Sequence, residues 1–123
     1  MLKDSGDVVI HRGILFDYNA SQLLPESRLQ LDTLANHLLL NPVLVIEVGV
    51  HGDVRGSAKY HLHLTERQAK TIVEYLTNKG VNKTSLLPRG YGKNQVLYPQ
   101  PKSEEEHRLN RRTEFKVIRL LPE

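Results

Sequence analysis

Apolar residues recur along this chain with two spacings, which separate expected strands from expected helices. Residues 8–16 are typical of a strand with a bulge at Gly13. Residues 24–40 carry leucines at helical spacing, and Pro25 stands early in this segment, where a missing N–H does no harm. Residues 43–50 are apolar on both faces, which favours a strand in the middle of a sheet.

A second helix is expected from Ser57 or Leu64 to Lys79. Thr65 is a candidate N-cap and Gly80 a candidate C-cap. Its inward stripe consists of Ala69, Ile72, Val73 and Leu76.

The last third of the chain predicts two strands and one short helix. Residues 85–91 read as a strand, and Pro88 within it indicates an edge position or a bulge. Residues 103–106 (SEEE) form a capping box for a short helix. Residues 113–120 alternate as a final strand. The order β-α-β-α-β-(α)-β predicts an α+β two-layer sandwich, with two long helices packed on one face of a mixed four-stranded sheet.

Composition narrows the class of protein. With 123 residues, we expect residues 1–123 to form a single domain. The sequence has no cysteine, which excludes disulfides and thiolate metal sites. No apolar run approaches the roughly 18 residues of a membrane span, and the first residues lack the apolar core of a signal peptide. We therefore expect a domain cut from a longer chain, with no direct membrane insertion of its own.

Charged residues concentrate where the central strand is expected to meet the second helix. The turn after residue 50 contains His51, Asp53 and Arg55, and the segment entering the helix adds histidines and charged side chains. Charged groups between a strand end and a helix start are a common way to build a binding site on a rigid frame. We expect the functional site here.

Several kinds of site compete for these residues. His51, Asp53, His61 and His63 could supply metal ligands, but pairs of the type HxH are common in a chain with six histidines, so we expect no metal and no cofactor. The chain has no GxSxG motif and no cysteine nucleophile, and we expect no enzyme.

Nucleic acid is not an expected partner either. Arg108, Arg111 and Arg112 cluster, and Arg119 follows, but no helix shows a basic stripe, and the net charge is only +3. A small zwitterion accounts for more of the unusual residues. Asp53 offers a carboxylate to an ammonium group, and arginines such as Arg67 or Arg111 offer forked donors to a carboxylate.

Five segments, in order, carry a family resemblance. They are residues 15–18 (LFDY), 51–56 (HGDVRG), 60–69 (YHLHLTERQA), 90–92 (GYG) and 110–115 (NRRTEF). Over about residues 14–118 the chain resembles the OmpA C-terminal-like domain, which is also found in Pal lipoproteins and MotB stator proteins. The resemblance implies a periplasmic domain that binds peptidoglycan without cleaving it, and that anchors an outer-membrane or envelope protein to the cell wall.

The resemblance also implies a pocket for the diaminopimelate side chain of the peptidoglycan stem peptide. Asp53 would pair with the ammonium group of diaminopimelate. The remaining implied ligand-binding residues are Phe16, Asp17, Tyr18, Leu64, Thr65, Arg67, Gln68, Asn110, Arg111 and Arg112.

One position departs from the family pattern. The arginine that receives the ligand carboxylate falls on Gln68, and Arg67 lies about 100° away around a helix. Three interpretations stay open. In the first, binding persists through Asp53, backbone donors and a reoriented Arg67 or Arg112. In the second, the ligand carries an amidated carboxylate. In the third, the module has lost the ligand and acts as a protein–protein interaction element of a secretion or motor complex.

Overall fold

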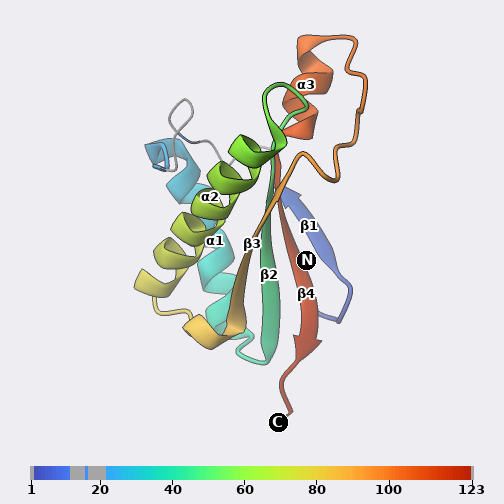
Figure 1. Ribbon diagram of the computed structural model, residues 1–123. Helices are drawn as coiled ribbons and strands as arrows, with labels where there is room; N and C mark the ends of the chain where they lie inside the picture. The colour runs from blue at the N-terminus through green and yellow to red at the C-terminus, as the bar shows by residue number, and fades with distance from the viewer. Residues whose placement is uncertain (1, 12–15, 17–21, 123) are drawn as a thin grey trace.

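Two long helices cover one face of a four-stranded sheet, and a third, short helix stands at one end of it (Figure 1). The computed structural model describes residues 2–11, 16 and 22–122. The elements are β1 (Val8–His11), α1 (Pro25–Leu40), β2 (Leu44–His51), α2 (Ala58–Asn78), a 3-10 turn (Lys83–Ser85), β3 (Leu86–Gly92), α3 (Glu104–Asn110) and β4 (Arg112–Leu120). The predicted α+β sandwich is confirmed.

The sheet is mixed, with the strand order β1-β4-β2-β3. β2 runs parallel to β3 and antiparallel to β4, and β1 pairs antiparallel with β4. β2 therefore lies inside the sheet, as its apolar sequence predicts. Pro88 lies on the edge strand β3, where the missing N–H breaks no ladder bond, so the predicted edge position is also confirmed.

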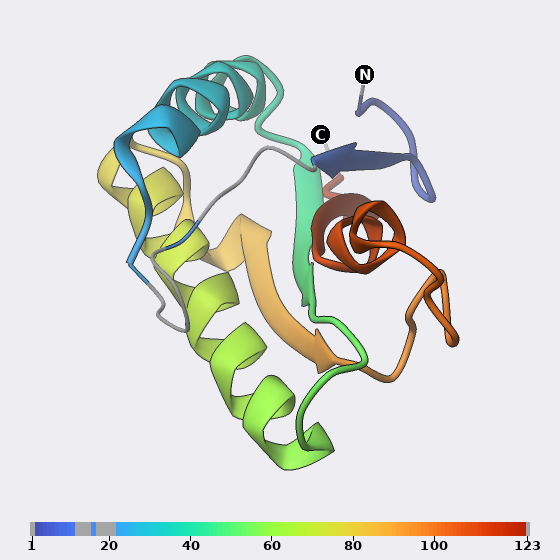
Figure 2. The same cartoon turned by 90° about the horizontal axis from the view of Figure 1, so that it is seen from above.

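The core lies between the sheet and the two long helices, which both lie on the same side of the sheet in the view from above (Figure 2). Alternate residues of β2 and β4 face the helices because side chains alternate along a strand. The buried contributors from the strands include Ile46, Val48, Val50, Phe115 and Val117; those from the helices include Leu31, Leu34, Leu38, Ala69, Ile72 and Leu76.

The start of α2 differs from one prediction. Ser57, not Thr65, is the N-cap, and its hydroxyl accepts a hydrogen bond from the N–H of Tyr60. Thr65 lies inside the helix, where its hydroxyl donates to the carbonyl of His61 and accepts the N–H of Gly92. Thr65 thus connects α2 to the end of β3 instead of capping a helix.

The other predicted ends lie close to those in the structure where it describes them. Pro25 is the first residue of α1. The C-cap of α2 is Lys79, so the prediction of Gly80 was one residue too late; Gly80, with φ of 105°, follows the cap. β1 ends at His11, so the predicted bulge at Gly13 lies outside the described residues. Phe16 forms an isolated antiparallel bridge with Leu23.

α2 approaches the backbone of β3 very closely at Gly90. A Cβ atom at this position would lie 2.3 Å from the backbone nitrogen of Glu66 and 2.7 Å from the carbonyl carbon of Thr65. Only glycine fits at this position. The close contact between α2 and β3 fixes the first half of α2 against the end of the sheet that carries the charged turn. None of the helices in the described part of the chain combines the length and apolarity that a membrane crossing requires.

Candidate functional site

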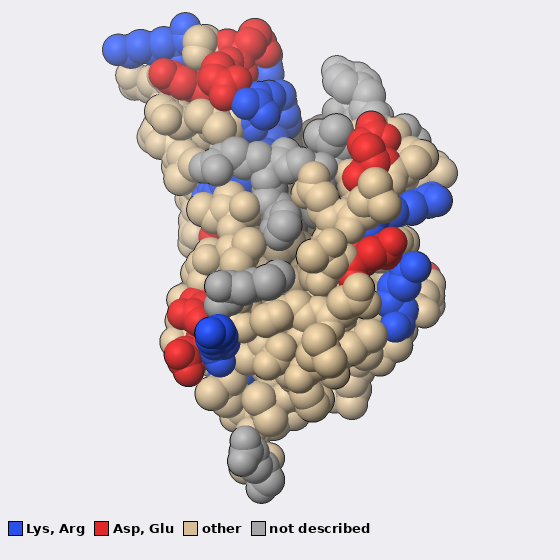
Figure 3. Space-filling model, turned by 180° about the vertical axis from the view of Figure 1, so that it is seen from behind, with Lys and Arg blue, Asp and Glu red and all other residues tan. Residues whose placement is uncertain are grey.

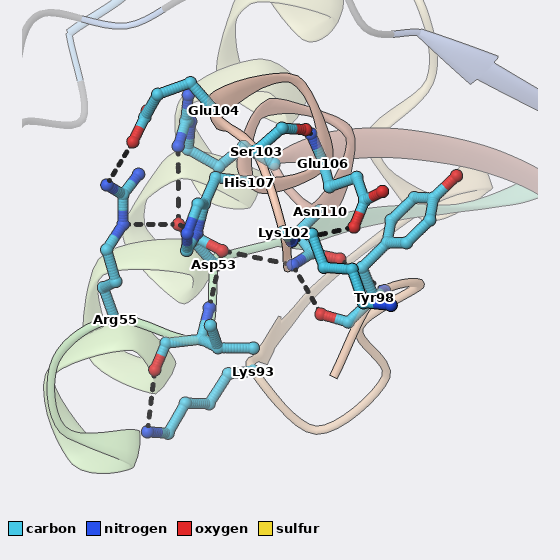
Figure 4. Close-up of polar contacts among 12 residues, drawn as sticks. Asp53, Arg55, Lys93, Tyr98, Lys102, Ser103, Glu104, Glu106, His107 and Asn110 are labelled. Carbon is cyan, nitrogen blue, oxygen red and sulfur yellow. Dashed lines mark hydrogen bonds and ion pairs between the residues drawn. The ribbon is translucent and has the colours of Figure 1, made fainter. Parts of the chain in front are cut away.

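Asp53 is the centre of a polar cluster at the end of the molecule that carries α3 (Figures 1 and 4). It lies in the turn after β2 and is only 3% exposed. Lys93 holds this turn in place, because its ammonium group donates to the carbonyls of Val54 and Gly56 at 3.2 and 2.7 Å. The carboxylate is therefore carried on a well-fixed segment of backbone.

Both carboxylate oxygens of Asp53 are satisfied by donors from this chain. Oδ1 accepts the N–H of Val54 at 2.8 Å and Nδ2 of Asn110 at 3.1 Å. Oδ2 accepts Nε of Arg55 at 2.9 Å, and Nδ1 of His107 lies 2.7 Å from it. Four donors thus converge on one buried carboxylate (Figure 4).

These donors keep the carboxylate ionised. Burial by itself raises the pKa of Asp53, but the hydrogen bonds from Asn110, Val54, Arg55 and His107 outweigh it and leave the pKa below its ordinary value. The cluster therefore holds a permanent negative charge at neutral pH, surrounded by cationic and neutral donors.

Asn110 connects this charge to the segment before α3. Its side chain is fully buried, and besides Asp53 it contacts the backbone of Tyr98 in both directions: Nδ2 donates to the carbonyl at 3.0 Å and Oδ1 accepts the N–H at 2.8 Å. One amide thus fixes the position of Asp53 relative to α3 and the loop that leads to it.

The side chains of the two arginines after Asn110 point in different directions. Nη1 of Arg111 is 3.6 Å from Oδ2 of Asp53, and the side chain is about half exposed. Arg112 is buried and turns away: its Nε donates to Glu114 at 2.6 Å and its Nη2 to the carbonyl of Gln95 at 3.0 Å. The structure brings Arg111, but not Arg112, to Asp53.

The expected pocket residues of α2 are spread over its faces. Leu64 and Thr65 are buried, Gln68 is half-buried, and Arg67 is exposed. Leu64 and Gln68 are four residues apart and so share a face of the helix. Phe16 packs against the core, and Asp17 and Tyr18 lie outside the described residues.

Sequence reasoning did not place Arg55 and His107 on Asp53, although both contact it directly. A signal for His107 exists in the sequence, because it precedes Asn110 by three residues and such a pair shares one face of a helix. Arg55 had a weaker signal, since a residue two positions from a turn aspartate can point in many directions.

The candidate metal ligands do not converge. His61 and His63 lie on α2 rather than on a strand, so they point in different directions; the ring of His61 contacts the carbonyl of Arg55, and His63 is exposed. Over residues 2–11, 16 and 22–122, no group of three or more histidine, cysteine, aspartate or glutamate side chains is arranged to hold a metal ion.

A groove of about 370 Å³ lies between α2 and β3. Glu66 and Lys70 of the helix and Arg89 and Tyr91 of the strand are among its lining residues. None of these four residues bonds Asp53.

The OmpA family model matches residues 15–111. The chain belongs to the OmpA family. It is 31% identical over 112 residues to outer membrane protein A of Bordetella avium, covering 90% of this chain and 57% of that protein. It is 36% identical over 101 residues to the peptidoglycan-associated lipoprotein of Pseudomonas aeruginosa, covering 82% of this chain and 59% of that protein. This OmpA-family domain therefore spans less than two thirds of the length of either relative.

Solved structures share the fold of this OmpA-family domain. A MotB-like protein from Desulfovibrio vulgaris superimposes with a TM-score of 0.79 at 24% identity, covering 94% of this chain and 73% of that one. The cell wall anchor of the T6SS from Pseudomonas aeruginosa gives a TM-score of 0.77 at 23% identity, covering 89% of this chain and 79% of that one.

Proposed function

We propose that this OmpA-family domain binds peptidoglycan without cleaving it, through the diaminopimelate side chain of the stem peptide. The observation that carries the proposal is the buried, ionised carboxylate of Asp53, held on a fixed turn at one end of the fold. One relative is a peptidoglycan-associated lipoprotein and one structural neighbour is a cell wall anchor, and both support the same ligand class.

In this proposal Asp53 receives the ammonium group of diaminopimelate. Gln68, on the same face of α2 as Leu64, receives the ligand carboxylate through its neutral amide. A charge-assisted, forked contact from an arginine is worth about 1.5–3 kcal/mol, so an amide in its place weakens each contact by roughly tenfold to a hundredfold. Many such contacts along a polymeric wall still add up to a firm tether.

The proposed location is the periplasm, and the proposed role is to anchor a larger envelope protein to the cell wall. The relatives support this, since they are an outer membrane protein and a lipoprotein that extend beyond the matched region. The attachment to the outer membrane or envelope would lie in a part of the protein outside this sequence.

Co-sedimentation with purified sacculi tests the proposal. Asp53→Ala should abolish sedimentation, because the ligand ammonium loses its counter-charge. Asp53→Asn is a second variant of nearly the same shape, which guards against loss of folding. Asp32→Asn is the matched control, since Asp32 is also engaged by a tyrosine and a lysine, Tyr75 and Lys79, which do not contact Asp53.

Two outcomes would count against the proposal. If folded Asp53→Asn pellets as fully as the wild type, Asp53 does not receive the ligand. If the wild type ignores sacculi but co-purifies with envelope proteins, the domain is an interaction module instead.

A further inference from the structure

Arg55 bridges two carboxylates at the Asp53 cluster. Its Nε donates to Oδ2 of Asp53 at 2.9 Å, and its Nη1 donates to Oε1 of Glu104, on α3, at 3.0 Å. Figure 4 shows the guanidinium lying between these two side chains. A cation supplied by the chain itself therefore already stands against the carboxylate to which the proposed function assigns the ligand amine.

We propose that Arg55 occupies the cation position of this site in the ligand-free domain, and that a ligand ammonium group binds by displacing it. The inference rests on the proposed function for the assignment of the amine to Asp53. It adds that binding is an exchange of one cation for another, with Arg55 as the residue that competes with the ligand.

An exchange is required because the carboxylate has no spare capacity. An ionised carboxylate offers about four acceptor positions. Val54, Asn110, Arg55 and His107 supply one donor each, and Asp53 itself is buried. A ligand ammonium group must therefore replace one of these donors to reach an oxygen.

Arg55 is the donor that can leave. The N–H of Val54 belongs to the adjacent backbone, and Asn110 is fully buried and tied to Tyr98. The side chain of His107 is 17% exposed, whereas that of Arg55 is 52% exposed. Only Arg55 can move into solvent without opening a packed region.

Glu104 gives the displaced arginine a second partner. Its side chain is 78% exposed and already bonds Nη1 of Arg55, so the guanidinium keeps one ion pair after it leaves Asp53. Arg111 does not share this behaviour, because its nearest nitrogen is 3.6 Å from Oδ2, too far for a hydrogen bond. The exchange therefore exposes no unpaired charge on the protein.

Removing the competing cation should tighten ligand binding. The probe is the stem tripeptide that ends in meso-diaminopimelate, titrated by calorimetry into the wild type, Arg55→Ala and Arg55→Gln. Because the guanidinium of Arg55 is half exposed and solvent screens its charge, we expect affinity to rise by about two- to fivefold in both variants. Arg108→Ala is the matched control, since Arg108 is an exposed arginine paired with Glu105 that does not bond Asp53.

A second probe isolates the exchange. The same tripeptide with the side-chain amine of diaminopimelate acetylated carries no cation at this position, so neither Arg55 variant should bind it more tightly than the wild type does. Thermal melting of each variant shows that it is folded; Arg55→Gln retains a neutral donor should Arg55→Ala not fold.

The outcomes separate this inference from the proposed function. Tighter binding of the cationic tripeptide alone supports the exchange. If Asp53→Asn loses binding while both Arg55 variants bind equally or more weakly than the wild type, the exchange is overturned and the proposed function stands. If Asp53→Asn binds like the wild type, or neither the wild type nor the Arg55 variants bind the tripeptide, both are overturned.

Discussion

His51 is a buried imidazole at the end of β2, two residues before Asp53. Its ring stacks on Tyr91 with centroids 4.5 Å apart and an interplanar angle of 5°. Neither ring nitrogen has a hydrogen-bond partner among the residues that the structure describes, and Oε2 of Glu114 lies 3.8 Å away. The imidazole is therefore held in its neutral form, because burial without hydrogen-bond partners raises the free energy of the charged form.

The protonation of His51 predicts acid sensitivity. Burial, and then the charge of Arg112, lower the pKa of His51 from 6.5 to about 4, against the opposing effect of Glu114. The unfolded chain takes up this proton below pH 6.5 and the folded domain only near pH 4, so the free energy of unfolding falls as the pH drops through this window. The total loss is about 3 kcal/mol.

Urea denaturation of the wild type and His51→Phe between pH 7 and pH 4 measures this effect. Phenylalanine keeps a flat ring against Tyr91 and does not titrate, so the variant should lose less stability over this range. Asp53 does not affect this comparison. Its pKa is lowered from 3.8 in the folded domain, so its contribution to the free energy of unfolding is lost only as the pH falls below 3.8. Parallel stability curves would show that His51 does not carry the acid response.

A substitution at Gln68 tests whether this side chain contacts the ligand. If its amide faces the ligand carboxylate, Gln68→Arg should tighten binding of the diaminopimelate tripeptide by about tenfold to a hundredfold, because a forked, charged contact replaces a neutral one. Calorimetry measures the change. Asn78→Arg, at the far end of α2, adds the same charge elsewhere and should have little effect. Unchanged or weaker affinity in Gln68→Arg would remove Gln68 from the ligand site.

The crossing of α2 over β3 is the contact between elements that positions the site. Gly90→Ala places a Cβ atom against backbone atoms of Glu66 and Thr65, which cannot rotate away. We expect a loss of about 3 kcal/mol in the free energy of unfolding, as for other overpacked positions. Gly49→Ala is the comparison, since its Cβ would meet the ring of Tyr91, a side chain that can shift.

Chemical denaturation of these two variants distinguishes the contacts. Gly90→Ala should be clearly less stable than Gly49→Ala, and it should also disturb the hydrogen bond from Gly92 to Thr65 beside it. Equal stabilities would mean that the crossing relaxes easily and does not hold the helix rigidly against the sheet.

At the scale of the whole molecule, local patterns predicted the elements and missed the contacts between them. The apolar run of β2, the proline of β3 and the capping serine of α3 each act through neighbouring backbone, so sequence reveals them. The sequence left two possible starts for α2, Ser57 and Leu64, and the N-cap at Thr65 was wrong, because residues 58–63 are not buried and show no apolar periodicity that would choose between them.

In the candidate site, too, local patterns predicted the segments but not the contacts between distant ones. The turn that holds Asp53 was predicted from its position after β2. The contact of His107 with Asp53 and the different directions of Arg111 and Arg112 depend on how α3 packs against that turn, and the burial of His51 depends on its neighbours on β3 and β4. Contacts between segments more than 50 residues apart, such as His107 with Asp53, separated by 54, leave no local pattern.

On one face of the molecule, charged side chains of both signs lie at the end that carries α3 (Figure 3). The exposed members on α3 and just before it are Lys102, Glu104, Glu105 and Arg108. The Asp53 cluster lies at this same end, so a charged ligand approaches the site through a field of both signs.

The strand order has a consequence for how the domain forms. β4 comes last of the four strands along the chain, yet it lies between β1 and β2. The first strand has no ladder partner until the last one has inserted, and Asp53 gains His107 and Asn110 from the segment just before that strand. Because these long-range contacts depend on one another, we expect the domain to unfold as one cooperative unit, and we expect the Asp53 cluster to be complete only when β4 is in place.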